Sequence, residues 1–258
     1  MFFHIQIFLY SILFFFVVKF VSSEPVSAAI NITSTKGLWL AVILLLALII
    51  YFYQIARRVS REASMTPMPI LFALSTCGLL YFIQPENQQY IFMALSATLY
   101  YFIHISLYRL SVYKKDKTAL GIIAGGGIGT LFLFYAMSYG IYLNFDISLW
   151  TLVFVLMIVT MFSSFQYFSL ISDNRKNVLN YSLVLGLVMA EIVWVLNFWP
   201  FGYLTTGVIT LIFYYIFWDL VKCHFLDELS QKRVVGNMVF FGFLVLVVLS
   251  SAKWLPVV

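Results

Sequence analysis

Charge is what this sequence has least of. Only 10% of its 258 residues are charged and 63% are hydrophobic, whereas soluble domains contain about 25% charged and roughly 45 to 50% apolar residues. A soluble domain of this length could not bury so much apolar side chain. The shortage of charge therefore excludes a soluble globular protein and predicts that the lipid bilayer surrounds much of the chain.

Cysteine is also scarce, and the two cysteines do not form a motif. Cys77 lies inside one apolar run and Cys223 lies near the end of another. Neither belongs to a CxxC or Cys/His spacing, so a disulfide framework and a structural zinc site have no support. We interpret both cysteines as packing residues and predict neither a metal site nor a cofactor.

Familiar catalytic motifs are absent as well. The sequence has no HExxH, no GxSxG, no intramembrane pair of glutamates with a matching histidine, and no aspartate-rich motif for magnesium and a diphosphate. A retinal lysine would lie in the middle of the last helix, whereas Lys222 and Lys253 lie at segment ends. We therefore predict no catalytic residue, and an enzyme is the less favoured interpretation.

Long apolar runs dominate what is present, and they predict an all-α polytopic bundle of transmembrane helices. Runs of about 17 to 25 residues fit a hydrocarbon core about 30 Å thick. The third run is short and opens with Pro67 and Pro69, which predicts a proline-bounded first turn. A polar, small-residue stretch follows the first run, so cleavage there would leave eight spans, although Lys19 favours a retained anchor. The nine predicted segments are 2–21, 38–56, 69–84, 90–112, 119–145, 148–171, 181–199, 203–226 and 235–254.

The distribution of basic residues predicts the orientation. Lysines and arginines gather in alternate loops, which the positive-inside rule places in the cytoplasm, with the carboxyl terminus outside. Trp39, Trp150, Trp199 and Trp254 would then lie near the outer interface. The net charge of +5 is thus explained by membrane topology, and we predict no nucleic-acid partner.

We expect a first helix or signal anchor with an exterior loop in 1–37 and the bundle in 38–258. The halves 38–145 and 146–258 resemble each other. One interpretation is a parallel repeat of four helices each, and the other is chance similarity between aromatic-rich helices.

Two ionisable residues inside the apolar runs predict a binding site. Glu191 lies deep in the seventh segment, where an unpaired charge costs at least about 2.5 to 3.5 kcal/mol. His104 shares one helical face with Tyr101 and Tyr108 in the fourth segment. Counted from the predicted cytoplasmic ends, Glu191 and His104 lie at similar depth. They could form a proton relay or cation site, or they could simply hold two helices together.

Three further features have local explanations. Gly121, Gly125 and Gly129 have the small-xxx-small spacing of close helix packing, with a local break of the helix as the alternative. Asp219 and Lys222 lie three residues apart near a helix end, which indicates local pairing and snorkelling. We interpret Arg109 in the same way.

The run AEIVWVLNFWP at 190–200, together with residues 203–218 and 233–254, resembles the carboxyl-terminal part of uncharacterised multi-pass membrane proteins of small-genome candidate-phylum bacteria. The resemblance covers about the last quarter of the chain. It implies a polytopic protein of the bacterial inner membrane with an acidic residue in the antepenultimate span, and it implies no activity.

The favoured functional interpretation is transport or sensing of a small solute or ion through the Glu191 and His104 site. The alternative is a non-catalytic scaffold subunit that binds other membrane proteins. A lipid-modifying enzyme ranks lowest, because such an enzyme needs clustered polar residues at the membrane interface.

Overall fold

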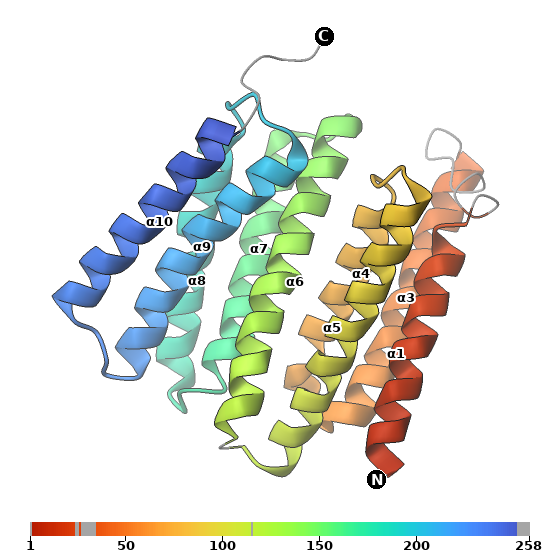
Figure 1. Ribbon diagram of the computed structural model, residues 1–258, viewed down its shortest axis with the longest axis horizontal. Helices are drawn as coiled ribbons and strands as arrows, with labels where there is room; N and C mark the ends of the chain where they lie inside the picture. The colour runs from red at the N-terminus through yellow and green to blue at the C-terminus, as the bar shows by residue number, and fades with distance from the viewer. Residues whose placement is uncertain (1, 24–25, 27–34, 115, 252–258) are drawn as a thin grey trace. The chain divides into compact units, whose positions relative to one another are not determined.

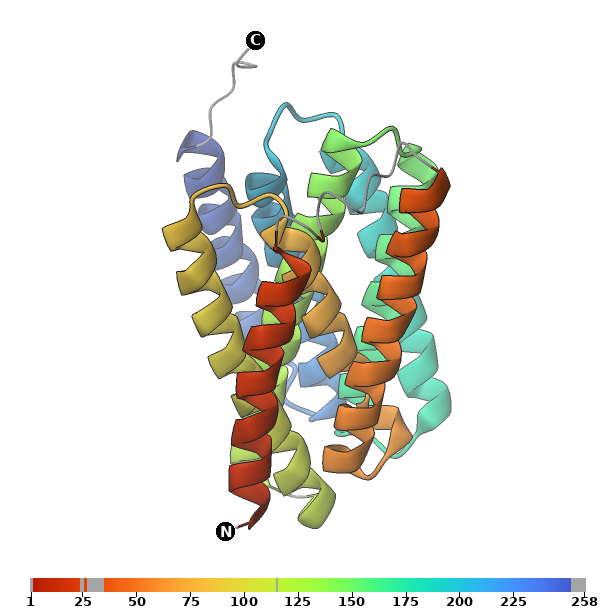
Figure 2. The ribbon, with the colours of Figure 1, turned by 90° about the vertical axis from the view of Figure 1, so that its right-hand side faces the viewer.

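The structure is a computed structural model that describes residues 2–23, 26, 35–114 and 116–251. These residues form nine α-helices and one short 3₁₀ helix, with no strand among them (Figures 1 and 2). The predicted all-α helical bundle is confirmed. The elements are α1 (Phe2–Val21), α3 (Thr35–Ser60), η1 (Ala63–Met65), α4 (Pro67–Leu80), α5 (Glu86–Val112), α6 (Lys117–Asn144), α7 (Leu149–Phe168), α8 (Arg175–Leu196), α9 (Tyr203–Phe225) and α10 (Gln231–Ser251). Lys253 and Trp254, with most of the predicted first exterior loop, lie outside the described residues.

Eight of the described helices are long and apolar enough to cross a membrane, and α1 is one of them. The sequence predicted nine spans, and the predicted span that is missing from the eight is the third segment. There α4 begins with prolines in its first turn, as expected, but it contains only 14 residues. At about 1.5 Å per residue it is roughly 21 Å long, which is short of a hydrocarbon core about 30 Å thick. More than half of its residues are nevertheless buried, so neighbouring helices rather than lipid surround it.

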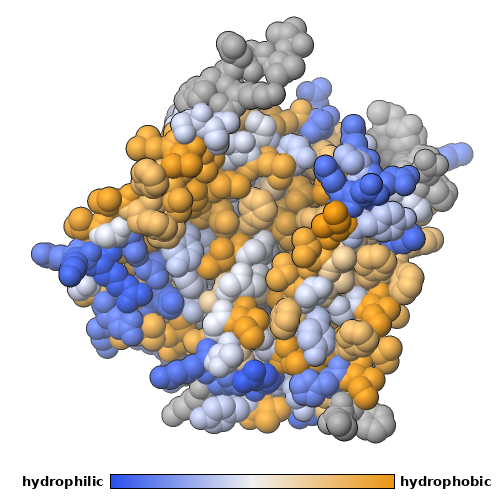
Figure 3. Space-filling model, viewed as in Figure 1, coloured by the Kyte–Doolittle hydropathy of each residue, from blue (hydrophilic) through white to orange (hydrophobic). Residues whose placement is uncertain are grey.

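The exposed surface of the long helices is itself apolar. Phe16 is 62% exposed, Trp150 is 74% exposed and Val239 is 67% exposed. On the face shown in Figure 3, hydrophobic side chains cover the length of the helices, and hydrophilic ones gather near the helix ends. Such a surface would be costly in water and is stable in lipid. The chain is therefore a multi-pass membrane protein.

The chain divides into two compact units, residues 1–130 and 131–258. In the first unit α5 packs against α1, α3 and α4. In the second unit α8 packs against α7 and α9, and α10 packs against α9. The division falls inside α6, which contributes residues to both units. The parallel repeat of 38–145 and 146–258 stays a prediction.

The loop between α5 and α6 carries a defined polar contact. Asp116 Oδ1 accepts a hydrogen bond from the Ala119 backbone N–H at 3.0 Å, and Asp116 Oδ2 lies 2.7 Å from an Arg109 guanidinium nitrogen. The backbone hydrogen bond at the start of α6, helped by Arg109, lowers the pKa of the Asp116 carboxyl below its ordinary 3.8. Arg109 therefore pairs locally, as expected, and its partner is Asp116.

Candidate functional site

His104 is fully buried in the first unit. Its Nδ1 lies 2.9 Å from the carbonyl oxygen of Tyr100. Because a carbonyl only accepts hydrogen bonds, Nδ1 carries the hydrogen and Nε2 is left as the acceptor of the neutral ring. Nε2 has no hydrogen-bond partner among the described residues. His104, a predicted site residue, thus has one ring nitrogen that is hydrogen-bonded within its own helix and one ring nitrogen without a hydrogen bond.

Aromatic rings surround this imidazole. The Tyr100 ring lies 4.0 Å from the His104 ring and stacks on Phe14 at 4.3 Å between centroids. Phe52 and Phe72 contact Tyr100 from α3 and α4. Helices α1, α3, α4 and α5 therefore meet around one buried tyrosine and one buried histidine.

Two more polar atoms near this point lack a partner. The hydroxyls of Tyr100 and Tyr51 are buried and form no hydrogen bond with the described residues, and they lie close enough to interact electrostatically. An unsatisfied polar group in an apolar medium costs several kcal/mol. We call Tyr51, Tyr100 and His104 the polar cluster. The described residues leave the hydrogen-bonding capacity of these three side chains unused.

Tyr101 and Tyr108 lie on the face of α5 that α1 covers. The Tyr108 ring stacks on Phe3 at 4.9 Å, and the Tyr101 ring meets Phe8 edge-on at 6.3 Å. Both tyrosines are half-buried. Helical periodicity predicts that they share one face with His104. Their role in binding stays a prediction.

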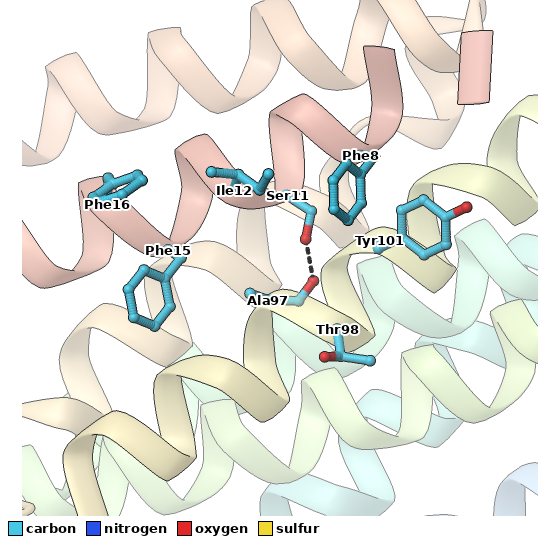
Figure 4. A pocket seen from close by; sticks show the side chains of 8 residues that line it. All are labelled: Phe8, Ser11, Ile12, Phe15, Phe16, Ala97, Thr98 and Tyr101. Carbon is cyan, nitrogen blue, oxygen red and sulfur yellow. Dashed lines mark hydrogen bonds between the residues drawn. The ribbon is translucent and has the colours of Figure 1, made fainter. Parts of the chain in front are cut away.

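A groove of 550 Å³ lies between α1 and α5 beside this face (Figure 4). Within it the Ser11 hydroxyl donates a hydrogen bond to the Ala97 carbonyl at 2.5 Å. Its volume is within the range of about 300 to 1,000 Å³ that small-molecule sites occupy. The lining residues are Phe8, Ser11, Ile12, Phe15, Phe16, Ala97, Thr98 and Tyr101.

Glu191 belongs to the second unit, and its side chain is exposed on α8. Exposed Leu187 and Trp194 lie one turn away on either side of it. The described residues give Glu191 no hydrogen bond and no ion pair. Because His104 lies in the other unit, the predicted pairing of Glu191 with His104 stays a prediction.

The predicted packing glycines are not the glycines in close contact. A Cβ atom at Gly121, Gly125 or Gly129 would meet no described heavy atom within 4 Å. A Cβ at Gly126, in the same run, would lie 2.9 Å from side-chain atoms of Ile103 and Met68. Close approaches to a neighbouring backbone occur instead at Gly186, where a Cβ would lie 3.0 Å from the Met157 carbonyl oxygen, and at Gly207, where it would lie 3.0 Å from Ala136 Cα. Small-residue spacing in one helix cannot say which neighbour approaches it, and here the tight crossings are α7 with α8 and α6 with α9.

Asp219 is a site that local sequence reasoning missed. It is buried near the end of α9, where Asn237 donates a hydrogen bond to its Oδ2 at 2.5 Å and Arg233 lies 3.8 Å from its Oδ1. The predicted pair with Lys222 is wrong, because Lys222 Nζ lies over the Trp218 ring at 5.2 Å. The signal that could have found this contact is the spacing of Arg233 and Asn237, four residues apart on one face of α10.

The residues described in the two units show no ligand set of a metal ion. No group of three or more His, Cys, Asp or Glu side chains able to hold a metal comes together in the described part of the chain. The chemistry that the two units present is hydrogen bonding and proton exchange by imidazole, phenol, hydroxyl and carboxyl groups.

Comparison with known proteins adds a family and no activity. No curated protein and no solved structure matches the chain. A family model does match it, over residues 15–251, which include α3 to α10 and the last two turns of α1. The chain therefore belongs to DUF5656, a family described as proteins of unknown function.

Proposed function

We propose that the protein transports or senses a small solute or ion within the membrane, and that the polar cluster of the first unit binds it. The observation that carries this proposal is the set of buried polar atoms without partners on Tyr51, Tyr100 and His104. Packing alone does not require such groups in a bilayer, where each unpaired group is costly. The bacterial inner membrane, implied by the resemblance of the last quarter of the chain, is the membrane we propose.

The cluster specifies the chemistry of its ligand. His104 Nε2 accepts a hydrogen bond, and the two phenol hydroxyls either donate or accept. The faces of the surrounding rings attract a cation. A small polar solute or a cation fits this set better than an anion does, because the cluster contains no positive charge. The groove between α1 and α5 offers an apolar approach to the α1-covered face of α5.

Chemical modification of histidine tests whether the cluster can be reached. The chain has three histidines, of which His4 and His224 are exposed and His104 is buried. The full-length protein in liposomes is treated with diethyl pyrocarbonate, and each histidine peptide is followed by mass spectrometry. We expect modification at His104 in the folded protein as well as at both exposed controls. Modification of His104 only after unfolding would contradict the proposal.

A thermal-shift screen identifies the ligand class. A ligand that binds only the folded protein raises its melting temperature by mass action. We expect a small polar solute or cation to stabilise the wild type and not His104→Phe, which keeps an aromatic ring and removes both nitrogens. Tyr113→Phe, exposed at the carboxyl end of α5, is the matched control outside the site, and it should keep the shift. If His104→Phe responds like the wild type, the cluster is not the binding site.

A scaffold subunit is the second candidate function, and α10 favours it. None of the 21 residues of α10 is buried, although its sequence is apolar enough to span the membrane. Its surface is therefore available to a helix of another membrane protein. The test is native mass spectrometry of the complex extracted from its own membrane. Release as a lipid-bound monomer would contradict the scaffold role.

A further inference from the structure

Glu191 is an exposed acidic side chain near the middle of the apolar run of α8. It lies ten positions after Tyr181 and eight positions before Trp199, the two ends of the predicted span. At about 1.5 Å per residue, each end is roughly 12 to 15 Å away. A hydrocarbon core about 30 Å thick contains no water at that depth, and a carboxyl group there is costly unless another group bonds to it. The described residues supply no such group.

The exposed side of α8 is a stripe of large apolar side chains with Glu191 inside it. Successive members are three or four positions apart, which puts them on one helical face. Between 44% and 48% of each apolar member is exposed. Trp194 continues this surface to Phe198, whose ring it meets edge-on at 5.2 Å between centroids. We call Leu183, Leu187, Glu191 and Trp194 the α8 stripe.

The opposite side of α8 is already packed. Ser182, Gly186 and Val193 are buried there, and α8 contacts α7 and α9 (Figure 1). A Cβ atom at Gly186 would lie 3.0 Å from the Met157 carbonyl oxygen, so the backbones of α7 and α8 are in close contact. A rotation of α8 that turned Glu191 inward would break this crossing. The stripe therefore stays on the surface of the second unit.

The described part of the chain has no cation at the depth of Glu191. Every lysine and arginine there lies in a loop or in the first or last turn of a helix. His104 is fully buried in the first unit, so its ring is closed to another molecule. The group that a second copy of the chain presents at the right depth is its own Glu191, because a carboxylic acid both donates and accepts hydrogen bonds.

We propose that the α8 stripe is the contact between two copies of this chain, and that their two Glu191 carboxyl groups hydrogen-bond to each other at its centre. Copies of a membrane protein share one orientation in the bilayer, because their basic loops stay in the cytoplasm. A two-fold axis along the membrane normal therefore brings the same stripe of each copy together, with the two Glu191 side chains at one depth. Leu187 and Trp194 pack around the pair, one turn away on either side.

The carboxyl pair needs no cation. A carboxyl group that carries a hydrogen donates its O–H to an oxygen of the other carboxyl group, and when both carry a hydrogen each donates one bond. Two charged carboxylates would repel each other in a medium of low dielectric constant, so the pair contains at least one hydrogen. The contact thus bonds the polar atoms that each single copy exposes to lipid.

A second copy fits the stripe better than a helix of another protein does. The second copy supplies the matching group at the matching depth, whereas another protein would need a hydrogen-bond donor placed there separately. The stripe belongs to the second unit and shares no residue with the polar cluster or with α10. The dimer therefore stands or fails independently of solute binding at His104 and of a scaffold role for α10.

Disulfide cross-linking locates the contact. Leu187→Cys and Trp194→Cys are made in the full-length protein, reconstituted into liposomes with a large excess of lipid and oxidised with copper phenanthroline. We expect both variants to form a covalent dimer. Val239→Cys on α10, where the native side chain is 67% exposed, is the matched control and should stay monomeric. The wild type, with its free Cys77 and Cys223, is the blank.

Energy transfer between donor-labelled and acceptor-labelled copies measures the strength of the dimer as lipid is added to the liposomes. We expect Glu191→Leu to weaken the dimer by about threefold to thirtyfold, as the loss of a hydrogen bond between membrane helices does. Glu191→Gln keeps a side chain that donates and accepts, so it should dimerise more tightly than Glu191→Leu. Glu86→Leu removes an exposed carboxyl group outside the stripe and should dimerise like the wild type.

Other outcomes would overturn the proposal. Cross-linking of Val239→Cys as fast as that of Leu187→Cys would show random collision. Wild-type copies without energy transfer at any lipid ratio are monomers, and the stripe then has a different occupant. If Glu191→Leu dimerises as tightly as the wild type, or if Glu191→Gln is as weak as Glu191→Leu while both melt at the wild-type temperature, the carboxyl groups do not hold the two copies together.

Discussion

The substitution of one glycine tests how α6 and α9 pack in the second unit. In Gly207→Ala the new methyl carbon would lie 3.0 Å from Ala136 Cα, 3.1 Å from its backbone N and 3.2 Å from its Cβ. Comfortable contact between carbon atoms needs about 3.5 to 4.0 Å. Two of the three neighbours are backbone atoms that cannot rotate away. The two helices must therefore move apart by roughly half an ångström.

The magnitude follows from two opposing terms. Overpacking of this kind costs about 1 to 3 kcal/mol, whereas replacing glycine by alanine inside a helix gains about 1 kcal/mol. Gly125→Ala is the matched control, because its methyl group would meet no described atom within 4 Å and only the gain applies. We expect Gly207→Ala to be less stable than Gly125→Ala by about 1 to 3 kcal/mol.

The measurement is unfolding of both purified variants in one detergent, followed by tryptophan fluorescence. The wild type is unfolded in the same way. Its stability should lie between those of the two variants or close to that of Gly207→Ala. If Gly207→Ala is as stable as Gly125→Ala, the α6–α9 crossing is looser than the structure shows. If Gly125→Ala is instead the destabilised variant, the glycine spacing in the sequence identified the packing face correctly.

Two other predictions concern charged groups near helix ends. The contacts of Asp116 at the start of α6 lower its pKa from 3.8, so their contribution to stability is complete above the ordinary pKa and is lost as the pH falls through the folded value. Asp116→Asn should melt with less acid dependence than the wild type, and identical pH profiles would exclude this contribution. Asn237→Leu should destabilise the second unit by about 1 to 3 kcal/mol, because it leaves a buried carboxylate oxygen with only the weak thiol donor of Cys223. Lys222→Met should change the stability by less than about 0.5 kcal/mol, and equal effects of these two substitutions would contradict the assigned partners of Asp219.

Helix positions were largely predictable from the apolar runs, and helix ends were less so. Segment 203–226 agrees closely with α9 (Tyr203–Phe225), and segment 90–112 agrees with the end of α5 (Glu86–Val112) but begins four residues after its start. Helix α8 begins at Arg175 rather than at 181, and α10 begins at Gln231 rather than at 235. The predicted segments followed the apolar side chains, whereas backbone hydrogen bonding continues a helix through flanking basic residues. A helix can extend beyond the hydrocarbon that its apolar part spans.

Contacts along one helix were easier to predict than contacts between helices. Periodicity alone put Tyr101, His104 and Tyr108 on one face of α5. It could not show that α1 covers that face, or that Tyr51 reaches the same cluster from α3. The nearest opposite charge in sequence to Asp219 is Lys222, but its partners come from α10, 14 and 18 positions further on.

The sequence by itself determined that this protein is a bundle of membrane helices, because composition and the length of apolar runs decide how a chain partitions between water and lipid. It also identified the few polar residues that the runs enclose. Only the tertiary structure decided which of these residues meet: the polar cluster around His104, and the carboxylate of Asp219 beside Asn237 and Arg233. The physical reason is that hydrogen bonds and close packing depend on distances of a few ångströms between helices, and those distances are set by the pairing and rotation of whole helices rather than by any local pattern.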